Sequence, residues 1–133
     1  MMSSSQAAPR RHTRQREAIV RVIQASRGPL AVNDILERAQ REHDGLGIAT
    51  VYRTLKLLLE DGTVRQVILP SGETRYEMSG LGHHHHFQCR RCGEVVDLDV
   101  CPVAVLTGTT LAGGYTVEGH ELTLYGVCPS CQE

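Results

Sequence analysis

All five cysteines of the chain follow position 88, and four of them form two Cys-x-x-Cys pairs. Each pair spaces two thiols so that one turn can direct both sulfurs at a single ion. Two such turns complete the tetrahedral sulfur cage that is typical of structural Zn²⁺. Disulfides and redox-active pairs are the alternatives, but the doubled motif favours zinc. The fifth cysteine, Cys101, precedes Pro102, and we expect it to be a small buried side chain near the start of a helix. The predicted structural zinc ligands are Cys89, Cys92, Cys128 and Cys131.

A run of four histidines, at positions 83–86, lies just before the first cysteine pair. If this run is a strand, successive side chains point to opposite faces. His84 and His86 would then share one face, and His83 and His85 the other, so that one run could serve two separate metal sites. Imidazole binds zinc, iron, manganese, copper and nickel, so the histidines alone do not select the metal. A solvated polar strand edge is the alternative interpretation. Further candidate ligands in the chain are Glu77, Asp97 and His120.

The elements that precede these ligands read as three helices followed by two short strands. The first helical pattern begins near Thr13, a suitable N-cap, and ends at 28–29, and the third covers residues 49–59. Strands at 63–69 and 74–77 flank a turn. Three helices and a hairpin predict a winged helix, with a generic helical bundle as the alternative. The predicted inward-facing side chains are Ile19, Val22, Ile23, Ile35, Leu36, Ala39, Val51, Leu55, Leu58 and Leu59.

The third helical pattern has a second face that is suited to the major groove of DNA. Ala49, Tyr52, Arg53 and Lys56 recur at the spacing of one helix face. Arg53 could donate hydrogen bonds to a guanine edge or a phosphate, and Tyr52 could pack on a thymine methyl group. An arm containing Arg10 and Arg11 could enter a minor groove. The predicted DNA contacts are Arg11, Ala49, Thr50, Tyr52, Arg53 and Lys56.

The composition is that of a folded chain of one or two small domains, with 41% hydrophobic and 22% charged residues among 133. The net charge of −1 conceals an asymmetry. Residues 1–77 hold 12 Lys and Arg against 9 Asp and Glu (+3), whereas residues 78–133 hold 2 against 6 (−4). The basic half could bind a polyanion, and the acidic half could hold cations. Neither a signal peptide nor a membrane span is evident, so we expect a cytoplasmic protein without a membrane partner.

Several of these motifs resemble those of the ferric uptake regulator (Fur) superfamily of bacterial metal-sensing repressors, in family order and spacing. They are the Gly-Ile-Ala-Thr-Val-Tyr-Arg-Thr-Leu segment at 47–55, the histidine run and both cysteine pairs. The resemblance covers nearly everything between residues 11 and 131. It implies an α+β fold with a disordered arm at 1–10, a winged helix-turn-helix DNA-binding domain at 11–77, a hinge at 78–82, and a small α/β dimerisation and metal-sensing domain with structural zinc at 83–133. It also implies a homodimer on palindromic double-stranded operator DNA.

The resemblance also implies the ligands of each metal site. The paired cysteines match the structural zinc site. The regulatory site matches Glu77, His84, His86 and Asp97. A further family site matches His83, His85 and His120 together with an acidic residue of a helix. Because Ala104 stands at that helix position, we expect metal binding there to be weak or absent.

Within the superfamily the chain is most similar to zinc uptake regulators (Zur), through the segments 83–87, 101–102 and 114–120. Three positions bear on the sensed metal. Asp97 is typical of iron- and manganese-type members, and Met78 stands where several zinc regulators carry a cysteine. Pro29 stands near the position of an iron-type histidine ligand. Two imidazoles and two carboxylates suit four-coordinate zinc, with Mn²⁺ or Fe²⁺ and added water as alternatives.

These features predict a metal-dependent transcriptional repressor, controlling metal-uptake genes in response to zinc. Iron-, manganese- or peroxide-sensing members of the same family are the alternatives within the superfamily. A zinc storage or chaperone protein is the alternative from another class. Such a protein would not need the basic DNA-reading face of the third helix. We expect no enzymatic activity, because neither an H-E-x-x-H motif nor the H-x-E motif of zinc deaminases occurs in the chain.

Overall fold

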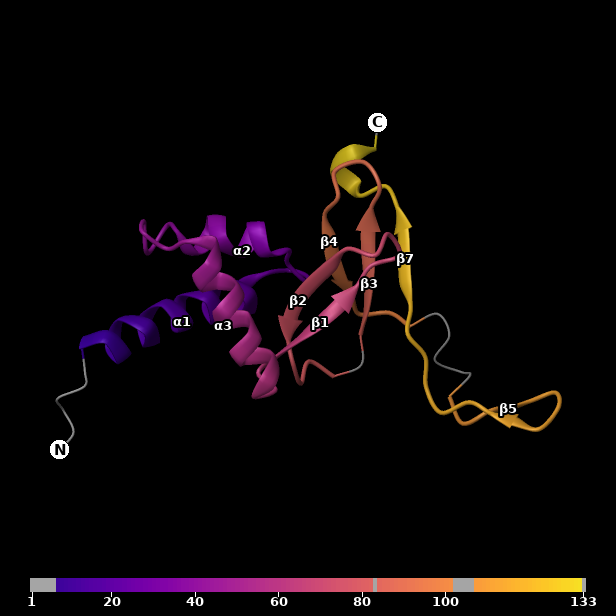
Figure 1. Cartoon of the computed structure of the whole chain (residues 1–133). Helices are drawn as coiled ribbons and strands as arrows, with labels where there is room; N and C mark the ends of the chain where they lie inside the picture. The colour runs from indigo at the N-terminus through magenta and orange to yellow at the C-terminus, as the bar shows by residue number, and fades with distance from the viewer. Residues whose placement is uncertain (1–6, 83, 102–106, 133) are drawn as a thin grey trace. The chain divides into compact units, whose positions relative to one another are not determined.

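The computed structural model describes residues 7–82, 84–101 and 107–132, with side chains from Thr13 onward. The chain divides into two compact units, Met1–Gly80 and Leu81–Glu133. Figure 1 shows three helices and a hairpin in the first unit and a separate set of strands in the second. This is the α+β fold that the sequence predicts. Among the described residues, none of the helices combines the length and the apolar character that crossing a bilayer requires.

Helix α1 (Ala7–Ala25) begins six residues before the expected N-cap at Thr13. Residues 7–10, which were expected to belong to a disordered arm, are therefore helical, and residues 1–6 lie outside the described part. Ala7 and Ala8 have the highest helix propensity, and Pro9 is tolerated in a first turn because its missing N–H would have no helical partner there. The side chains of Arg10 and Arg11, predicted to contact DNA, lie outside the described residues.

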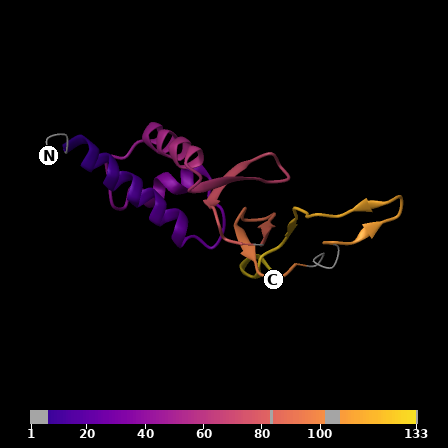
Figure 2. The same ribbon diagram turned by 90° about the horizontal axis from the view of Figure 1, so that it is seen from below.

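Helices α2 (Val32–Ala39) and α3 (Ile48–Glu60) pack with α1 against a hairpin of β1 (Val64–Ile68) and β2 (Thr74–Met78). The two strands are antiparallel, and Gln66 pairs with Tyr76. Leu30 adds a short bridge to the hairpin, because its N–H and C=O both bond to the backbone of Tyr76. The predicted winged helix is thus the observed arrangement (Figures 1 and 2).

The core of the first unit is formed by the hydrophobic stripes that the sequence predicts. Buried side chains come from all three helices and both strands, so each element buries its apolar face against the others. Val22, Leu36 and Leu59 are only partly buried against this core. The buried cluster consists of Ile19, Ile23, Leu30, Ile35, Ala39, Leu46, Val51, Leu55, Leu58, Val64 and Tyr76.

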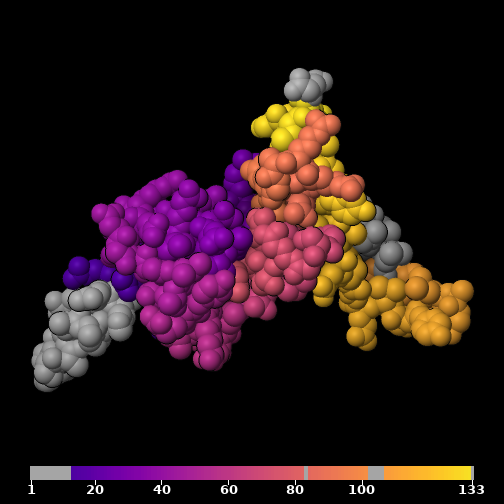
Figure 3. Space-filling view, turned by 45° about the horizontal axis from the view of Figure 1, so that its top comes forward, coloured from indigo at the N-terminus to yellow at the C-terminus, as the bar shows by residue number. Residues whose placement is uncertain are grey.

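The second unit is built on a three-stranded sheet in the order β4-β3-β7. Strand β3 (His85–Cys89) is central; it pairs antiparallel with β4 (Val95–Leu98) and parallel with β7 (Thr123–Gly126). A small hairpin of β5 (Thr110–Leu111) and β6 (Tyr115–Thr116) projects from this sheet (Figures 1 and 3). The helix expected after Cys101, including Ala104, falls at 102–106 and lies outside the described residues.

Few apolar side chains are buried in the second unit. Among its described residues, the buried hydrophobic positions are Cys89, Val95 and Cys128, and two of these three belong to the cysteine pairs. His85 and His86 are buried as well, although both are polar. The interior of this unit is thus made largely of groups that can ligate a metal.

Candidate metal centres and nucleic-acid interface

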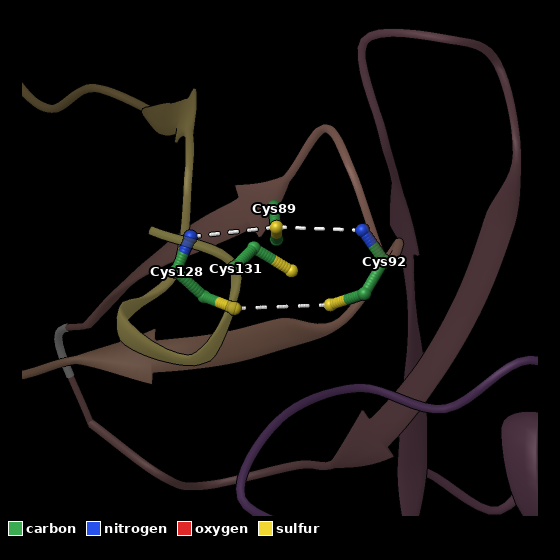
Figure 4. Close-up of side chains that lie close together, drawn as sticks. All are labelled: Cys89, Cys92, Cys128 and Cys131. Carbon is green, nitrogen blue, oxygen red and sulfur yellow. Dashed lines mark hydrogen bonds between the residues drawn. The ribbon is translucent and has the colours of Figure 1, made fainter. Parts of the chain in front are cut away.

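The two Cys-x-x-Cys pairs come together at one end of the three-stranded sheet (Figure 4). Cys89 ends β3 and Cys92 lies in the turn to β4. Cys128 is the N-cap of the short 3-10 helix η2 (Pro129–Cys131), which follows β7, and Cys131 is the last residue of that helix. All four sulfur atoms lie within 4.8 Å of one another, and the Sγ atoms of Cys92 and Cys128 are 3.8 Å apart. A regular tetrahedron with zinc–sulfur bonds of about 2.3 Å has edges of about 3.8 Å, so the four thiols fit structural zinc.

Two tight turns produce this cage. Gly93 has φ of +81°, a conformation that side chains disfavour, and its N–H donates to the carbonyl of Cys89 at 2.9 Å. Pro129 begins η2, where its fixed φ suits the first helical position. All five cysteines of the chain are free thiols, so the disulfide alternative is not realised in this structure.

The electrostatics of the cage favour a bound cation. Backbone N–H groups of Cys92, Cys128 and Arg91 point at the sulfur of Cys89, each at 3.4 Å, and these donors lower the pKa of Cys89 to about 6. In contrast, the neighbouring sulfurs of Cys128 and Cys89 raise the pKa of Cys131 to about 12. Four thiolates side by side repel one another, and a divalent ion would remove that repulsion.

The second unit also brings together three of the predicted regulatory ligands. His84, His86 and Asp97 offer donor atoms within 4.8 Å of one another. His86 pairs with Asp97 across β3 and β4, and its Nε2 lies 3.5 Å from the Asp97 Oδ1. The rings of His84 and His86 meet edge to face with centroids 4.9 Å apart, as strand alternation predicts. Nδ1 of His84 lies 2.9 Å from the carbonyl oxygen of Gly82.

Glu77, the fourth predicted regulatory ligand, belongs to the first unit. It lies on β2 opposite Arg65 of β1, and Arg65 Nε donates to Glu77 Oε2 at 2.6 Å. A carboxylate has about four acceptor positions, so one ion pair does not by itself exclude a metal ligand role.

His85 points to the other face of β3 from His84 and His86, and there its ring lies against that of His120 with centroids 4.8 Å apart. Cys101 joins this pair, since its sulfur lies within hydrogen-bond distance of both imidazoles. The expectation that Cys101 is a buried hydrophobic side chain is therefore wrong: its thiol is half-buried among polar donors. His83, predicted at the same site, lies outside the described residues.

Sequence reasoning missed Cys101 as a site residue because no local pattern links it to its neighbours. It is 16 residues from His85 and 19 from His120. The one available signal was composition, because a fifth cysteine in a unit rich in metal ligands is itself a candidate donor.

The predicted reading face of α3 is open to solvent. Ala49, Arg53 and Lys56 are exposed, and Tyr52 is 54% exposed. Thr50 is half-buried, and its hydroxyl accepts a hydrogen bond from Arg53 at 3.1 Å. The opposite face of the same helix is buried, so α3 is held by the core while its polar side remains free to meet a ligand.

Comparisons with known proteins agree with this arrangement. The sequence profile described as "Ferric uptake regulator family" matches residues 8–125. The ferric uptake regulation protein of Campylobacter jejuni is 34% identical over 125 residues, which cover 91% of this chain and 79% of that protein. A structure described as "zinc-bound manganese uptake regulator" has a TM-score of 0.76 and 29% identity, covering 86% of this chain and 87% of its own.

A second structure, FurB from M. tuberculosis, described as a zinc uptake regulator, has a TM-score of 0.54 and 29% identity; the match covers 96% of this chain and 99% of that one. The family profile and the curated relative each span most of the chain. The chain therefore belongs to the ferric uptake regulator family of metal-responsive regulators.

Proposed function

We propose that this chain is a transcriptional repressor that binds operator DNA as a homodimer when zinc occupies its regulatory site. The observation that carries this proposal is the cluster of His84, His86 and Asp97, which is a ligand set separate from the cysteine cage. A cage of four thiolates is a closed site that stabilises the fold. A site of imidazoles and carboxylates exchanges its metal more readily, so its occupancy can follow the metal concentration in the cell.

The reading face of α3 supports the DNA-binding part of the proposal. It presents a guanidinium, an ammonium and an exposed aromatic ring on a helix whose other side is fixed in the core. Arg53 is the residue we expect to contact a base edge or a phosphate, and Lys56 a phosphate. Arg11 lies within α1 and not in an arm before it, and it remains a proposed contact to DNA on the strength of its charge.

Glu77 would complete the regulatory site, as the family resemblance implies, and it belongs to the DNA-binding unit. One ion held by Glu77 and by the ligands of the second unit would restrict the hinge at 78–82. The two reading helices of a dimer would then stay at the separation that a palindromic operator requires. Metal and DNA would each raise the affinity for the other, by reciprocal coupling of about 1–3 kcal/mol.

Zinc is the proposed sensed ion because two imidazoles and two carboxylates make a four-ligand set that suits it. Relatives named for iron, manganese and zinc uptake all occur among the proteins this chain resembles. An iron- or manganese-responsive regulator is therefore the second candidate, and it is favoured by the carboxylate of Asp97, a hard ligand.

The homodimer part rests on the surface of the second unit. Strand β7 is an edge of the described sheet, and its Leu124 and Tyr125 are 37% and 58% exposed. An edge strand with exposed hydrophobic side chains is a surface that a second copy of the chain could cover.

The test is operator binding by protein that retains only its cage zinc, titrated anaerobically with Zn²⁺, Mn²⁺ and Fe²⁺. Fluorescence anisotropy of duplexes taken from upstream of the chain's own gene should show a zinc-dependent gain in affinity of about 5- to 150-fold. His86→Ala should abolish the gain, while His43→Ala, which removes a histidine outside the metal clusters of the described residues, should retain it. Equal affinity with and without metal would end the proposal.

The remaining outcomes distinguish the alternatives. A gain with manganese or iron(II) but not with zinc would assign the chain to another branch of the family. Stoichiometric zinc binding without affinity for any of the duplexes would favour zinc storage or delivery. Arg53→Ala should weaken operator binding by about 1–3 kcal/mol without changing metal content. Arg41→Ala removes an exposed positive charge from the turn after α2, and it is the matched control.

A further inference from the structure

The four residues of the cysteine cage are not equally protected from solvent. Cys89 and Cys128 are buried, whereas Cys92 is exposed and Cys131 is half-buried. Each Cys-x-x-Cys pair therefore contributes one buried residue and one accessible residue. We call Cys92 and Cys131 the open side of the cage, because a competing ligand would reach a bound ion past these two residues.

On the buried side, backbone hydrogen bonds join the two pairs. The N–H of Cys128 donates to the sulfur of Cys89 at 3.4 Å (Figure 4). The N–H of Arg90 donates to the carbonyl oxygen of Gly126 at 2.7 Å, directly beyond the last paired residues of β3 and β7. The buried side is thus a continuation of the pairing within the sheet.

On the open side, a side chain joins the two pairs. Arg91 immediately precedes Cys92, and its Nη1 donates to the carbonyl oxygen of Cys131 at 2.8 Å. The two residues are 40 positions apart in the sequence. This one hydrogen bond connects the turn that carries Cys92 to the helix η2 that carries Cys131, at the two most accessible ligands.

The distribution of charge supports a role for arginine beside the cage. Residues 78–133 contain two Lys or Arg residues against six Asp or Glu, and the two are Arg90 and Arg91, both between Cys89 and Cys92. Four thiolates outweigh the charge of one divalent ion, so the loaded cage is anionic. An acidic unit thus places its two permanently positive side chains next to its most negative group of ligands.

We propose that Arg91 is a latch on the open side of the cage and that it slows the loss of the structural zinc. While its guanidinium is bonded to the Cys131 carbonyl, the two turns are held together around the ion. Zinc loss then requires a local opening in which this bond breaks, without unfolding of the sheet. Arg91 is accordingly a positioning residue and not a ligand. The inference depends neither on DNA binding nor on which metal the regulatory site senses.

Arg90 provides a matched comparison, because it has the same charge and adjoins the same cage but contacts a different group. Its guanidinium carbon lies 5.0 Å from the centre of the Tyr125 ring on β7, within the range of a cation–π contact. Arg90→Met removes one positive charge and this contact, and it keeps the backbone bond to Gly126. Arg91→Met removes one positive charge and the bond to Cys131. The two variants therefore separate the latch from the charge.

The test is the rate at which an excess of a chromophoric chelator removes zinc from protein that carries zinc in the cage alone. Arg91→Met should lose zinc about three to ten times faster than the wild type, the range expected for loss of one exposed hydrogen bond. Arg90→Met should change the rate by less than about twofold, because an exposed charge contributes little. Arg91→Lys should lose zinc more slowly than Arg91→Met, because an ammonium group can still donate to the carbonyl. Equal rates for Arg91→Met and Arg90→Met would overturn the proposal.

Urea distinguishes a local latch from a general contribution to stability. Local opening exposes little surface, so the additional rate in Arg91→Met should hardly change at low urea concentrations. Arg91 is exposed, so the amides of β3 and β7 in zinc-loaded Arg91→Met should also exchange as slowly as in the wild type. A rate that rises steeply with urea, or a loss of that amide protection, would show that zinc leaves through unfolding and that Arg91 is not a latch.

Discussion

Removal of the cage metal should unfold the second unit and leave the first unit folded. The perturbation is extraction of zinc by a strong chelator, or the single replacement Cys128→Ser. Cys128 is one of the few buried hydrophobic positions of its unit, so the replacement removes both a ligand and a packed sulfur. The contrast between the two units is what makes this prediction specific.

The expected magnitude follows from what each unit buries. Besides the cage cysteines, Val95 is the buried hydrophobic residue among the described positions of the second unit. Full burial of such a side chain contributes about 1.5–3 kcal/mol, whereas a structural zinc site contributes about 10–16 kcal/mol in zinc-finger peptides. Loss of the metal therefore removes about as much free energy as the whole stability of a folded domain, which is about 5–15 kcal/mol. The first unit has a hydrophobic core shared by three helices and two strands, so we expect it to stay folded without the ion.

Amide hydrogen exchange read residue by residue is the suitable assay, because it reports each unit separately. After zinc extraction, amides of β3, β4 and β7 should exchange as in an unfolded chain, while amides of α1, α2 and α3 keep their protection. Cys101→Ser is the matched control, since it removes a sulfur outside the cage and should keep the cage zinc. Persistent protection of the three-stranded sheet in the metal-free protein would refute the reasoning.

Three further predictions concern packing, turn geometry and assembly. Leu55 is 1% exposed, and Leu55→Ala should destabilise the first unit by about 2–5 kcal/mol in urea unfolding. Leu57 lies on the same helix but is 47% exposed, and Leu57→Ala should change the stability by less than about 1 kcal/mol. Gly93→Ala should weaken cage zinc binding in a chelator competition by about 1–2 kcal/mol. The new Cβ would meet no atom within 4 Å, so the cost comes from the positive φ alone. Gly45→Ala is the control, because Gly45 has the same open space without a positive φ and its replacement should have no effect. Leu124→Asp should shift the sedimentation profile from dimer toward monomer while the cage zinc is retained, and an unchanged dimer would show that the β7 edge is not the interface.

Much of the architecture could be predicted because it is encoded locally. The helices follow from hydrophobic residues three and four positions apart, and Ile35 and Val51 are buried as that spacing requires. The cage could be predicted because each Cys-x-x-Cys pair is a complete half-site within one turn. Alternation along a strand likewise separated His84 from His85, and the two rings do lie in different clusters.

Other features depend on which segments become neighbours in space. Nothing near Leu30 in the sequence indicates that its backbone bonds to Tyr76, and nothing near Cys101 indicates two imidazoles within 3.2 Å. Both contacts follow from strand register, which is set by the packing of whole elements and not by spacing along the chain. Residue types and short periods thus specified the helices, the hairpin and the four-sulfur cage of this protein. His85, Cys101 and His120 meet because of the strand order β4-β3-β7. Pairing three distant segments in one sheet brings these residues together at one end of the strands.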